Sequence, residues 1–124
     1  DESLSHLLFA GADLYVMPSR FEPCGLTQMQ AMRYGAVPVV TATGGLVDTV
    51  VDADGDRSGT GFVAGRIRSE DLLAALFRAA RRLRDRHRTA ALRRRIMAID
   101  FSWRSPAADH LRLYEDVVDD RPRI

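Results

Sequence analysis

The residues best suited to chemistry gather in two turns between positions 17 and 46. The first turn carries one carboxylate and one thiol, Glu22 and Cys24, followed at once by Gly25. The second turn is the run Thr43-Gly44-Gly45. Glycine lets a ligand approach the backbone closely, which suits the binding of a phosphate. Either turn alone would also serve as a simple chain reversal, whereas the two together favour a phosphate or nucleotide-sugar site.

Short apolar runs predict the strands that hold these turns. Residues 12–17, A-D-L-Y-V-M, are closed by Pro18, which cannot continue a strand ladder. Residues 37–42 and 61–64 form two further runs of this kind. Because predicted helices separate them, the strands are expected to form a parallel sheet with helices against it.

The helix that follows the first turn is predicted over residues 25–34, with Gly35 as its left-handed end. Glu22 precedes a proline and is therefore expected in the loop before this helix. The first turn of such a helix offers free backbone N–H groups, which attract an anion. These groups belong to Gly25, Leu26 and Thr27. Since ligands bind beyond the carboxyl ends of parallel strands, both turns are expected at one crevice.

Further helices are predicted around the sheet, among them short ones over residues 46–51 and through residues 92–99. Residues 2–10 carry an apolar stripe that is expected to pack on the sheet, formed by Leu4, Leu7 and Leu8. Ser69 is expected to cap a helix in the middle of the chain, and the pair Ser105-Pro106 to open the last one. Phe101 and Trp103 are expected to anchor the C-terminal segment to the body. With about three strands, the sheet has exposed edges, which predicts self-association.

Composition excludes several classes of protein. At 124 residues, with 46% hydrophobic and 28% charged residues, the chain fits one globular domain. The net charge of +1 gives no general attraction to nucleic acid or membranes, and no apolar run is long enough for a membrane span. The single cysteine excludes an internal disulfide. We therefore expect a cytoplasmic location and neither a cofactor nor a metal site.

Two further features allow alternative functions. Cys24 beside a helix start would be a nucleophile if its pKa were lowered, although a thiol that lines a pocket fits better because no base is evident nearby. An arginine block would bind nucleic acid or another polyanion. No aromatic residues are interleaved with it and Asp85 interrupts it, so a solvated helix face is favoured. The block consists of Arg78, Arg81, Arg82, Arg84, Arg86, Arg88, Arg93, Arg94 and Arg95.

The sequence also resembles a known family. The run P-S-R-F-E-P-C-G-L-T-Q-M-Q-A-M-R-Y-G-A-V-P-V-V, followed by T-G-G-L-x-D-T-V, is similar to bacterial glycogen synthases and plant starch synthases, which are retaining glucosyltransferases of the GT-B fold. The resemblance extends over residues 2–118 and includes the F-S-W at 101–103. It implies an α/β fold class, a partial Rossmann-like parallel sheet with flanking helices that forms the C-terminal half-domain of a GT-B fold. Residues 1–100 would belong to the nucleotide-sugar-binding domain and residues 101–124 would form a C-terminal anchor and crossover helix.

The resemblance implies roles for the residues of both turns. Glu22 would be the catalytic residue and would face the glucose of an ADP-glucose or UDP-glucose donor, either as a nucleophile or, the role favoured, as a hydrogen-bond acceptor that orients the sugar. Cys24 would line the sugar pocket. Gly25 and Leu26 would offer backbone amides to the sugar or the distal phosphate, and Thr27 would bond the diphosphate. Thr43, Gly44 and Gly45 would close the same pocket.

The chain also departs from the pattern of related transferases. Many of them carry a second glutamate eight positions after the first, where this sequence has Gln30, a candidate for the ribose contact. The match covers only the last part of the second domain, so the acceptor-binding first domain and the upstream cations would lie elsewhere. The 124 residues alone are expected to be inactive. The alternative is a non-catalytic half-domain that self-associates.

Overall fold

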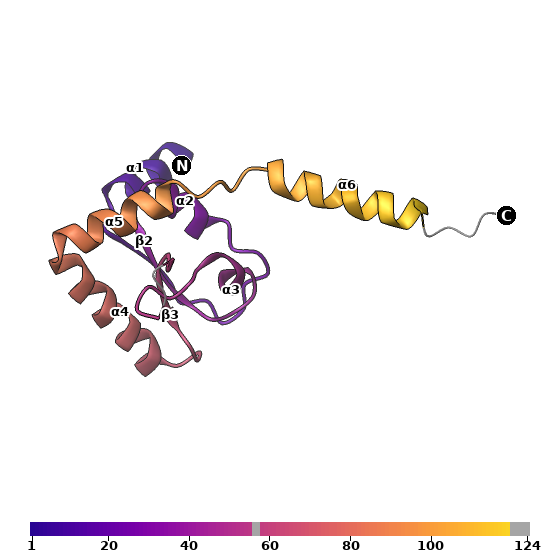
Figure 1. The fold of residues 1–124 in the computed structure, drawn as a ribbon. Helices are drawn as coiled ribbons and strands as arrows, with labels where there is room; N and C mark the ends of the chain where they lie inside the picture. The colour runs from indigo at the N-terminus through magenta and orange to yellow at the C-terminus, as the bar shows by residue number, and fades with distance from the viewer. Residues whose placement is uncertain (56–57, 120–124) are drawn as a thin grey trace.

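The computed structural model of the chain describes residues 1–55 and 58–119, and Figure 1 shows their arrangement. Residues 120–124 of the expected C-terminal segment lie outside the described residues. Helices and strands alternate as far as β3 and are followed by three helices. In chain order the elements are α1 (Glu2–Gly11), β1 (Leu14–Met17), α2 (Thr27–Arg33), β2 (Val37–Thr41), α3 (Gly45–Thr49), β3 (Phe62–Ala64), α4 (Ser69–Arg84), α5 (Arg86–Met97) and α6 (Arg104–Asp119).

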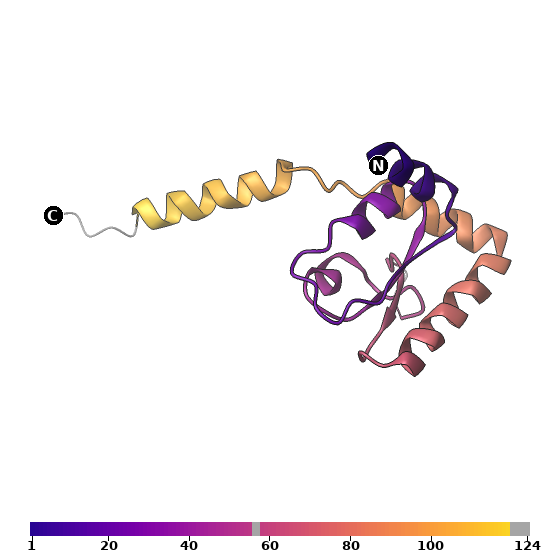
Figure 2. The same cartoon turned by 180° about the vertical axis from the view of Figure 1, so that it is seen from behind.

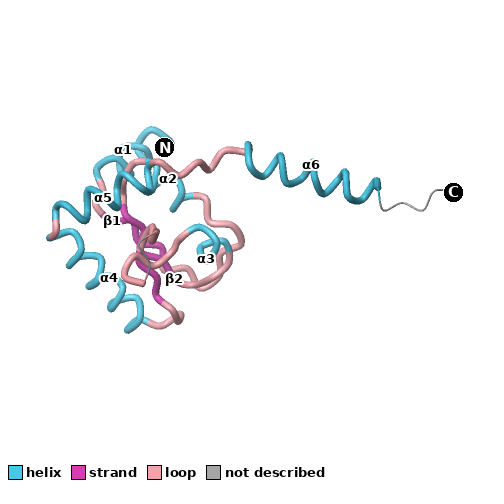
Figure 3. Tube along the Cα trace, in the orientation of Figure 1, coloured by secondary structure: helices cyan, strands magenta, loops and turns pink. Residues whose placement is uncertain are grey.

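The three strands form one parallel sheet in the order β1-β2-β3, which Figure 3 shows at the centre of the molecule. In the register of the sheet, Val39 of β2 lies between Val16 of β1 and Phe62 of β3. The predicted parallel sheet is confirmed, and each strand is one or two residues shorter than its apolar run. Every residue of β2 is buried because helices cover both faces of this central strand.

The core is divided between the two faces of the sheet. On one face α4 and α5 contribute Ala75, Ala79, Leu92 and Ile96, which pack with Phe62. On the other face the short helix α3 and the residue after it cover β2, through Leu46 and Val50 against Val40. The sheet therefore has a thick helical layer on one side and a thin one on the side of the second turn.

The turns at the helix ends differ in part from the sequence prediction. Gly35 has φ +83°, which confirms the left-handed end predicted after α2. Gly25 also has a positive φ, +67°, so it cannot begin α2, and the helix starts at Thr27 instead. Ser69 is the first residue of α4 rather than its cap, which is Arg68.

The prediction for α1 is wrong in one respect. Its leucine stripe is exposed, with Leu7 70% accessible, and no residue of α1 is buried. The helix is held instead by Phe9, whose ring contacts Tyr15 edge-on and stacks on Tyr34. Tyr34 also hydrogen-bonds His6, with 2.8 Å between Oη and Nδ1. Aromatic contacts with β1 and with the residue that follows α2 therefore replace the expected contact between the stripe and the sheet.

Helix α6 extends away from the body in Figures 1 and 2, which view the molecule from opposite sides. None of its residues is buried, and Trp103 just before it is 76% accessible. The ring of Trp103 lies near His110 of the same segment, so it does not anchor α6 to the rest of this chain. No helix in residues 1–55 or 58–119 combines the length and the apolar character needed to cross a membrane.

Candidate functional site

The structure brings the two glycine turns into direct contact beyond the carboxyl ends of β1 and β2. The N–H of Gly45 donates a hydrogen bond to the carbonyl of Pro23, at 3.2 Å. Gly44 has φ +48°, and a Cβ atom built on it would lie 1.4 Å from the carbonyl oxygen of Glu22. A Cβ on Gly45 would lie 1.9 Å from the carbonyl oxygen of Cys24. Both glycines of the second turn are therefore required by the backbone of the first turn.

The side chain of Glu22 folds back onto its own loop. Its Oε1 accepts a hydrogen bond from the N–H of Gly25 at 3.0 Å, and the side chain is partly buried. The other oxygen, Oε2, has no partner within the described residues. The loop thus holds the carboxylate in one orientation while one oxygen remains available to a ligand. Cys24, two residues further on, is exposed.

The start of α2 offers backbone donors next to this carboxylate. The N–H groups of Leu26, Thr27 and Gln28 have no acceptor among the residues that the structure describes, whereas the N–H of Gly25 is taken by Glu22. The hydroxyl of Thr27 accepts from Tyr15 at 2.8 Å, and its proton is directed at the sulfur of Met17. Its backbone N–H, rather than its side chain, is therefore the group that is free for an anion.

A buried glutamine that the sequence reasoning missed joins the two turns. Gln28 is fully buried, and its Nε2 donates to the carbonyl of Gly25 and to Oγ1 of Thr49, the latter at 2.9 Å. Thr49 in turn donates to the carbonyl of Gly45 at 2.8 Å. The polar chain runs from the first turn through α2 and α3 to the second turn. The feature of the sequence that could have identified Gln28 is that it is the one polar residue on the face of α2 that also buries Ala31 and Met32.

Gln30, the candidate for the ribose contact, lies on another side of α2. It is exposed and lines a hollow of about 520 Å³ between α2 and the segment that follows α5. The hollow is also lined by Met29, Arg33, Ala98, Ile99, Asp100, Phe101 and Ser102. The structure therefore groups Gln30 with the segment that leads to α6, not with the contact between the two turns.

Two cations that were not singled out from the sequence lie at the same edge of the sheet. Arg20 of the first loop and Arg68 before α4 line a small hollow of about 180 Å³ with Thr41, the last residue of β2. The hydroxyl of Thr41 donates to the carbonyl of Ser19, which ties the loop to the end of β2. Positive charge at this edge suits a ligand that carries phosphate.

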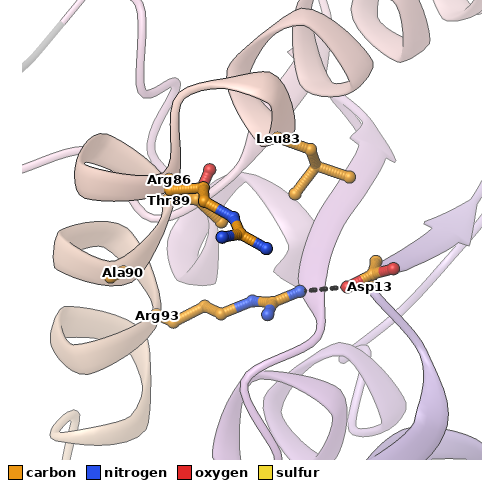
Figure 4. Close-up of a pocket in the computed structure, with 6 residues that line it drawn as sticks. All are labelled: Asp13, Leu83, Arg86, Thr89, Ala90 and Arg93. Atoms are coloured by element: carbon orange, nitrogen blue, oxygen red, sulfur yellow. Dashed lines mark hydrogen bonds and ion pairs between the residues drawn. The ribbon is translucent and has the colours of Figure 1, made fainter.

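A further hollow of about 440 Å³ lies near the start of β1, away from the two turns, and Figure 4 shows its lining. Arg93 points across it and pairs with Asp13, while Arg86 extends into the same space. In residues 1–55 and 58–119, no group of three or more His, Cys, Asp or Glu side chains is placed to hold a metal ion. The two turns therefore remain the best supported candidate site.

Comparisons with known proteins show the family to which the chain is similar. The family model described as Glycosyl transferases group 1 matches residues 2–94. The chain is 50% identical over 118 residues to a glycogen synthase of Anaeromyxobacter sp. (strain Fw109-5), covering 95% of this chain and 25% of that protein. It is 46% identical over 122 residues to glycogen synthase 2 of Bradyrhizobium diazoefficiens, covering 98% of this chain and 25% of the relative.

Two solved structures are also similar to the chain. The catalytic domain of starch synthase IV from Arabidopsis thaliana, solved with ADP and acarbose, superposes with a TM-score of 0.87 at 42% identity, over 96% of this chain and 25% of that one. A sucrose-phosphate synthase from Thermosynechococcus elongatus superposes with a TM-score of 0.65 at 27% identity, over 98% of this chain and 29% of the other. The chain thus spans about a quarter of the length of the glycogen synthases that it matches.

Proposed function

The chain belongs to the family of glycosyl transferases group 1, and from that premise we propose that it forms the donor-binding part of a glycogen or starch synthase. The proposed reaction moves glucose from ADP-glucose or UDP-glucose to the non-reducing end of an α-1,4-glucan, with retention at the anomeric carbon. The observation that carries this proposal is the contact between the turns of Glu22 and Gly44 at the carboxyl ends of neighbouring parallel strands.

Two expectations from the sequence are confirmed and support the proposal. The relatives confirm the resemblance to glycogen and starch synthases, and the solved structures confirm the fold class, a part of a Rossmann-like GT-B domain. The starch synthase IV structure carries ADP, a product that a donor of the ADP-glucose type would leave. This likeness favours ADP-glucose over UDP-glucose in the proposal.

The proposed roles of the site residues follow from the reaction. Glucosyl transfer must stabilise a departing diphosphate and a sugar with cationic character, which requires donors and charges that are oriented in advance. The free N–H groups of Leu26 and Thr27 would bind the distal phosphate or the sugar. Glu22, held through Oε1 by Gly25, would present Oε2 to the glucose as a hydrogen-bond acceptor. Cys24 would line the sugar pocket.

The remaining site residues would complete the pocket. The turn Thr43-Gly44-Gly45 would close it, since it already lies against the backbone of the Glu22 loop. The cations Arg20 and Arg68 lie at the same edge and would add positive charge near the diphosphate. Gln30 would contact the ribose only if the nucleoside extends along α2 towards the hollow that Gln30 lines.

The rest of the proposal concerns groups beyond this chain. Residues 1–100 would form part of the donor domain, and residues 101–124 an anchor and crossover helix. The glucan would bind through a separate acceptor domain, so these 124 residues alone would be inactive. The free edge of β1 would allow two copies to associate. A cytoplasmic location belongs to the same proposal.

The experiment that tests the proposal is a transfer assay with the protein encoded by the complete gene. Labelled glucose from ADP-glucose should enter glycogen faster than glucose from UDP-glucose, and proton NMR of the product should show α-linked glucose. A protein that binds neither nucleotide sugar and adds no glucose would leave the self-associating half-domain as the better account. Light scattering at high concentration then decides whether copies associate.

A further inference from the structure

The small net charge of the chain conceals a strong separation of charge. All 18 basic residues other than histidine are arginines, and residues 69–97 hold nine of them with three carboxylates, a net charge of +6. The remaining residues hold nine arginines and fourteen carboxylates, a net charge of −5. The hairpin of α4 and α5, visible along one side of the molecule in Figure 3, is therefore a concentrated positive region.

Part of this positive region is concave. A hollow of about 610 Å³ lies between α4, α5 and the turn before β3, and we call it the arginine groove. The groove is lined by Ala53, Asp54, Gly55, Arg81, Arg82, Arg88, Ala91 and Arg95. Four guanidinium groups from two helices thus share one hollow with a single carboxylate.

Two of these arginines are held in place by the protein. Arg82 donates to Asp54 Oδ1 at 2.8 Å and lies over the ring of the buried Phe62, with 5.8 Å between its Cζ and the ring centroid. Arg95 donates through both Nε and Nη2 to the carbonyl of Gly59. Guanidinium groups that are fixed before a ligand arrives lose little side-chain entropy when they bind it.

The other two arginines have unused binding capacity. Arg81 has no ion-pair or hydrogen-bond partner for its guanidinium among the described residues, and Arg88 reaches only Asp85, at 4.0 Å. The one carboxylate in the lining is already neutralised, because Asp54 accepts from Arg82 through Oδ1 and from Arg78 through Oδ2. The groove therefore keeps an excess of positive charge.

The groove is separate from the proposed donor site. The turn that contributes Ala53 and Asp54 precedes β3, whereas the turns of Glu22 and Gly44 follow β1 and β2. Because the three strands are parallel, the turn before β3 lies at the amino ends of the strands, and the turns of Glu22 and Gly44 lie at their carboxyl ends. A ligand in the groove would not touch the residues that hold the donor.

We propose that the arginine groove binds a small oligophosphate, a ligand with two or more linked phosphate groups. Guanidinium groups bind phosphate oxygens in pairs of parallel hydrogen bonds, and several converging groups favour a multiply charged anion. Single-stranded nucleic acid fits less well, since it requires exposed aromatic rings for stacking and the lining of the groove has none. The ligand would bridge α4, α5 and the turn before β3.

The test is a calorimetric titration of this chain with inorganic pyrophosphate. The groove variant, Arg81→Gln with Arg88→Gln, removes the two unused cations and leaves the Asp54 contacts intact. The matched control, Arg84→Gln with Arg94→Gln, removes the same charge from the same two helices at exposed positions outside the groove lining. Circular dichroism checks that both variants fold. An oligonucleotide of 20 nucleotides serves as the second probe.

We expect the groove variant to bind pyrophosphate about tenfold more weakly than the wild-type chain or worse, and the control variant to stay within about threefold of the wild type. Equal losses in both variants would show diffuse attraction to the positive helices and overturn the proposal. Absence of binding at millimolar pyrophosphate, or tighter oligonucleotide binding that both variants weaken equally, would overturn it too.

Discussion

A Cβ atom at position 44 would lie 1.4 Å from the carbonyl oxygen of Glu22, so Gly44 is seated directly on the backbone of the loop that presents this carboxylate. The neighbouring Gly45 accepts no Cβ either, since one would lie 1.9 Å from the carbonyl of Cys24. The position of Glu22 therefore depends on the second turn as well as on its own loop. A substitution in one turn is therefore expected to shift the backbone of the other turn.

The first prediction concerns Gly44→Ala. The new methyl group would overlap the Glu22 backbone, and φ of +48° is strained for alanine, so the free energy of unfolding should fall by at least about 2 kcal/mol. Urea unfolding followed by circular dichroism measures this. The control is Gly11→Ala, where nothing lies within 4 Å of the added Cβ and the helix should gain stability. Equal effects of the two substitutions on stability would contradict the close contact between the turns of Glu22 and Gly44.

The second prediction concerns the link between Gln28 and Thr49. Gln28→Met removes the donor to the carbonyl of Gly25 and to Oγ1 of Thr49, which should cost about 1–3 kcal/mol because the Gly25 carbonyl stays buried without its partner. Thr49→Val breaks the same link from the other side. A double-mutant cycle by urea unfolding should give a coupling energy of about 0.5–1.5 kcal/mol. Strict additivity would mean that the two side chains do not act together.

The sequence predicts the sheet well because β2 is apolar up to its last residue, Thr41, and prolines or glycines bound the runs of the other strands. The two turns are also foreseen, since parallel strands place their following loops at one edge. Gln28 is missed because the face of α2 that is buried depends on how the chain enters the helix, and the positive φ of Gly25 just before α2 sets that entry.

For α1 the prediction from the sequence fails in the opposite way, because residues expected to be buried are exposed. Its leucine stripe predicts contact with the sheet, but a pattern of apolar residues does not identify the surface that covers them. The ring contacts of Phe9 with Tyr15 and Tyr34 decide how α1 lies on this chain, and those contacts depend on tertiary structure. The clustering of four arginines in one groove likewise follows from the angle between α4 and α5, which the sequence does not give.

The third prediction concerns pH. Burial alone would raise the pKa of Asp52, but hydrogen bonds from the Val63 and Asp54 backbone and from Arg78 outweigh it and hold the pKa below its ordinary value of 3.8. The stabilisation that these contacts provide is fully present above pH 3.8 and is lost as the pH falls through the lowered pKa. Urea unfolding at pH 7 and at pH 3 should show a smaller loss for Asp52→Asn than for the wild type.

Asp100 provides a control for this pH effect. Its pKa is also lowered, by hydrogen bonds from the side chain and backbone of Ser102, so it adds its own loss of stability in acid. The loss of stability that Asp100 contributes in acid should persist in Asp52→Asn, because Asp100 lies in the segment after α5 and makes no contact with Arg78. If Asp52→Asn and the wild type lose the same stability between pH 7 and pH 3, the contacts of the Asp52 carboxylate with the Val63 and Asp54 backbone and with Arg78 do not operate in solution.

The fourth prediction concerns α6. Because α6 buries none of its residues against the described chain, removing residues 104–124 should change the free energy of unfolding by less than about 0.5 kcal/mol. The helical signal in circular dichroism should fall, while the cooperativity of unfolding should be unchanged. A large loss of stability would mean that α6 docks on the body of this chain in solution.

The fifth prediction concerns the chemistry at Glu22. Glutamine at this position keeps an oxygen that accepts from the Gly25 N–H, so Glu22→Gln should fold normally while it removes the charge near the sugar. In the protein encoded by the complete gene, turnover should fall by about a hundredfold or more, and the affinity for ADP should change by less than about threefold. Glycogen synthesis from labelled ADP-glucose and calorimetry with ADP measure these two quantities.

The comparison variant is Cys24→Ser, which retains a small polar side chain at an exposed position and should reduce turnover by less than about fivefold. The opposite pattern, with Cys24→Ser inactive and Glu22→Gln near normal, would assign the nucleophile to the thiol, because a serine hydroxyl is a far weaker nucleophile than a thiolate at neutral pH.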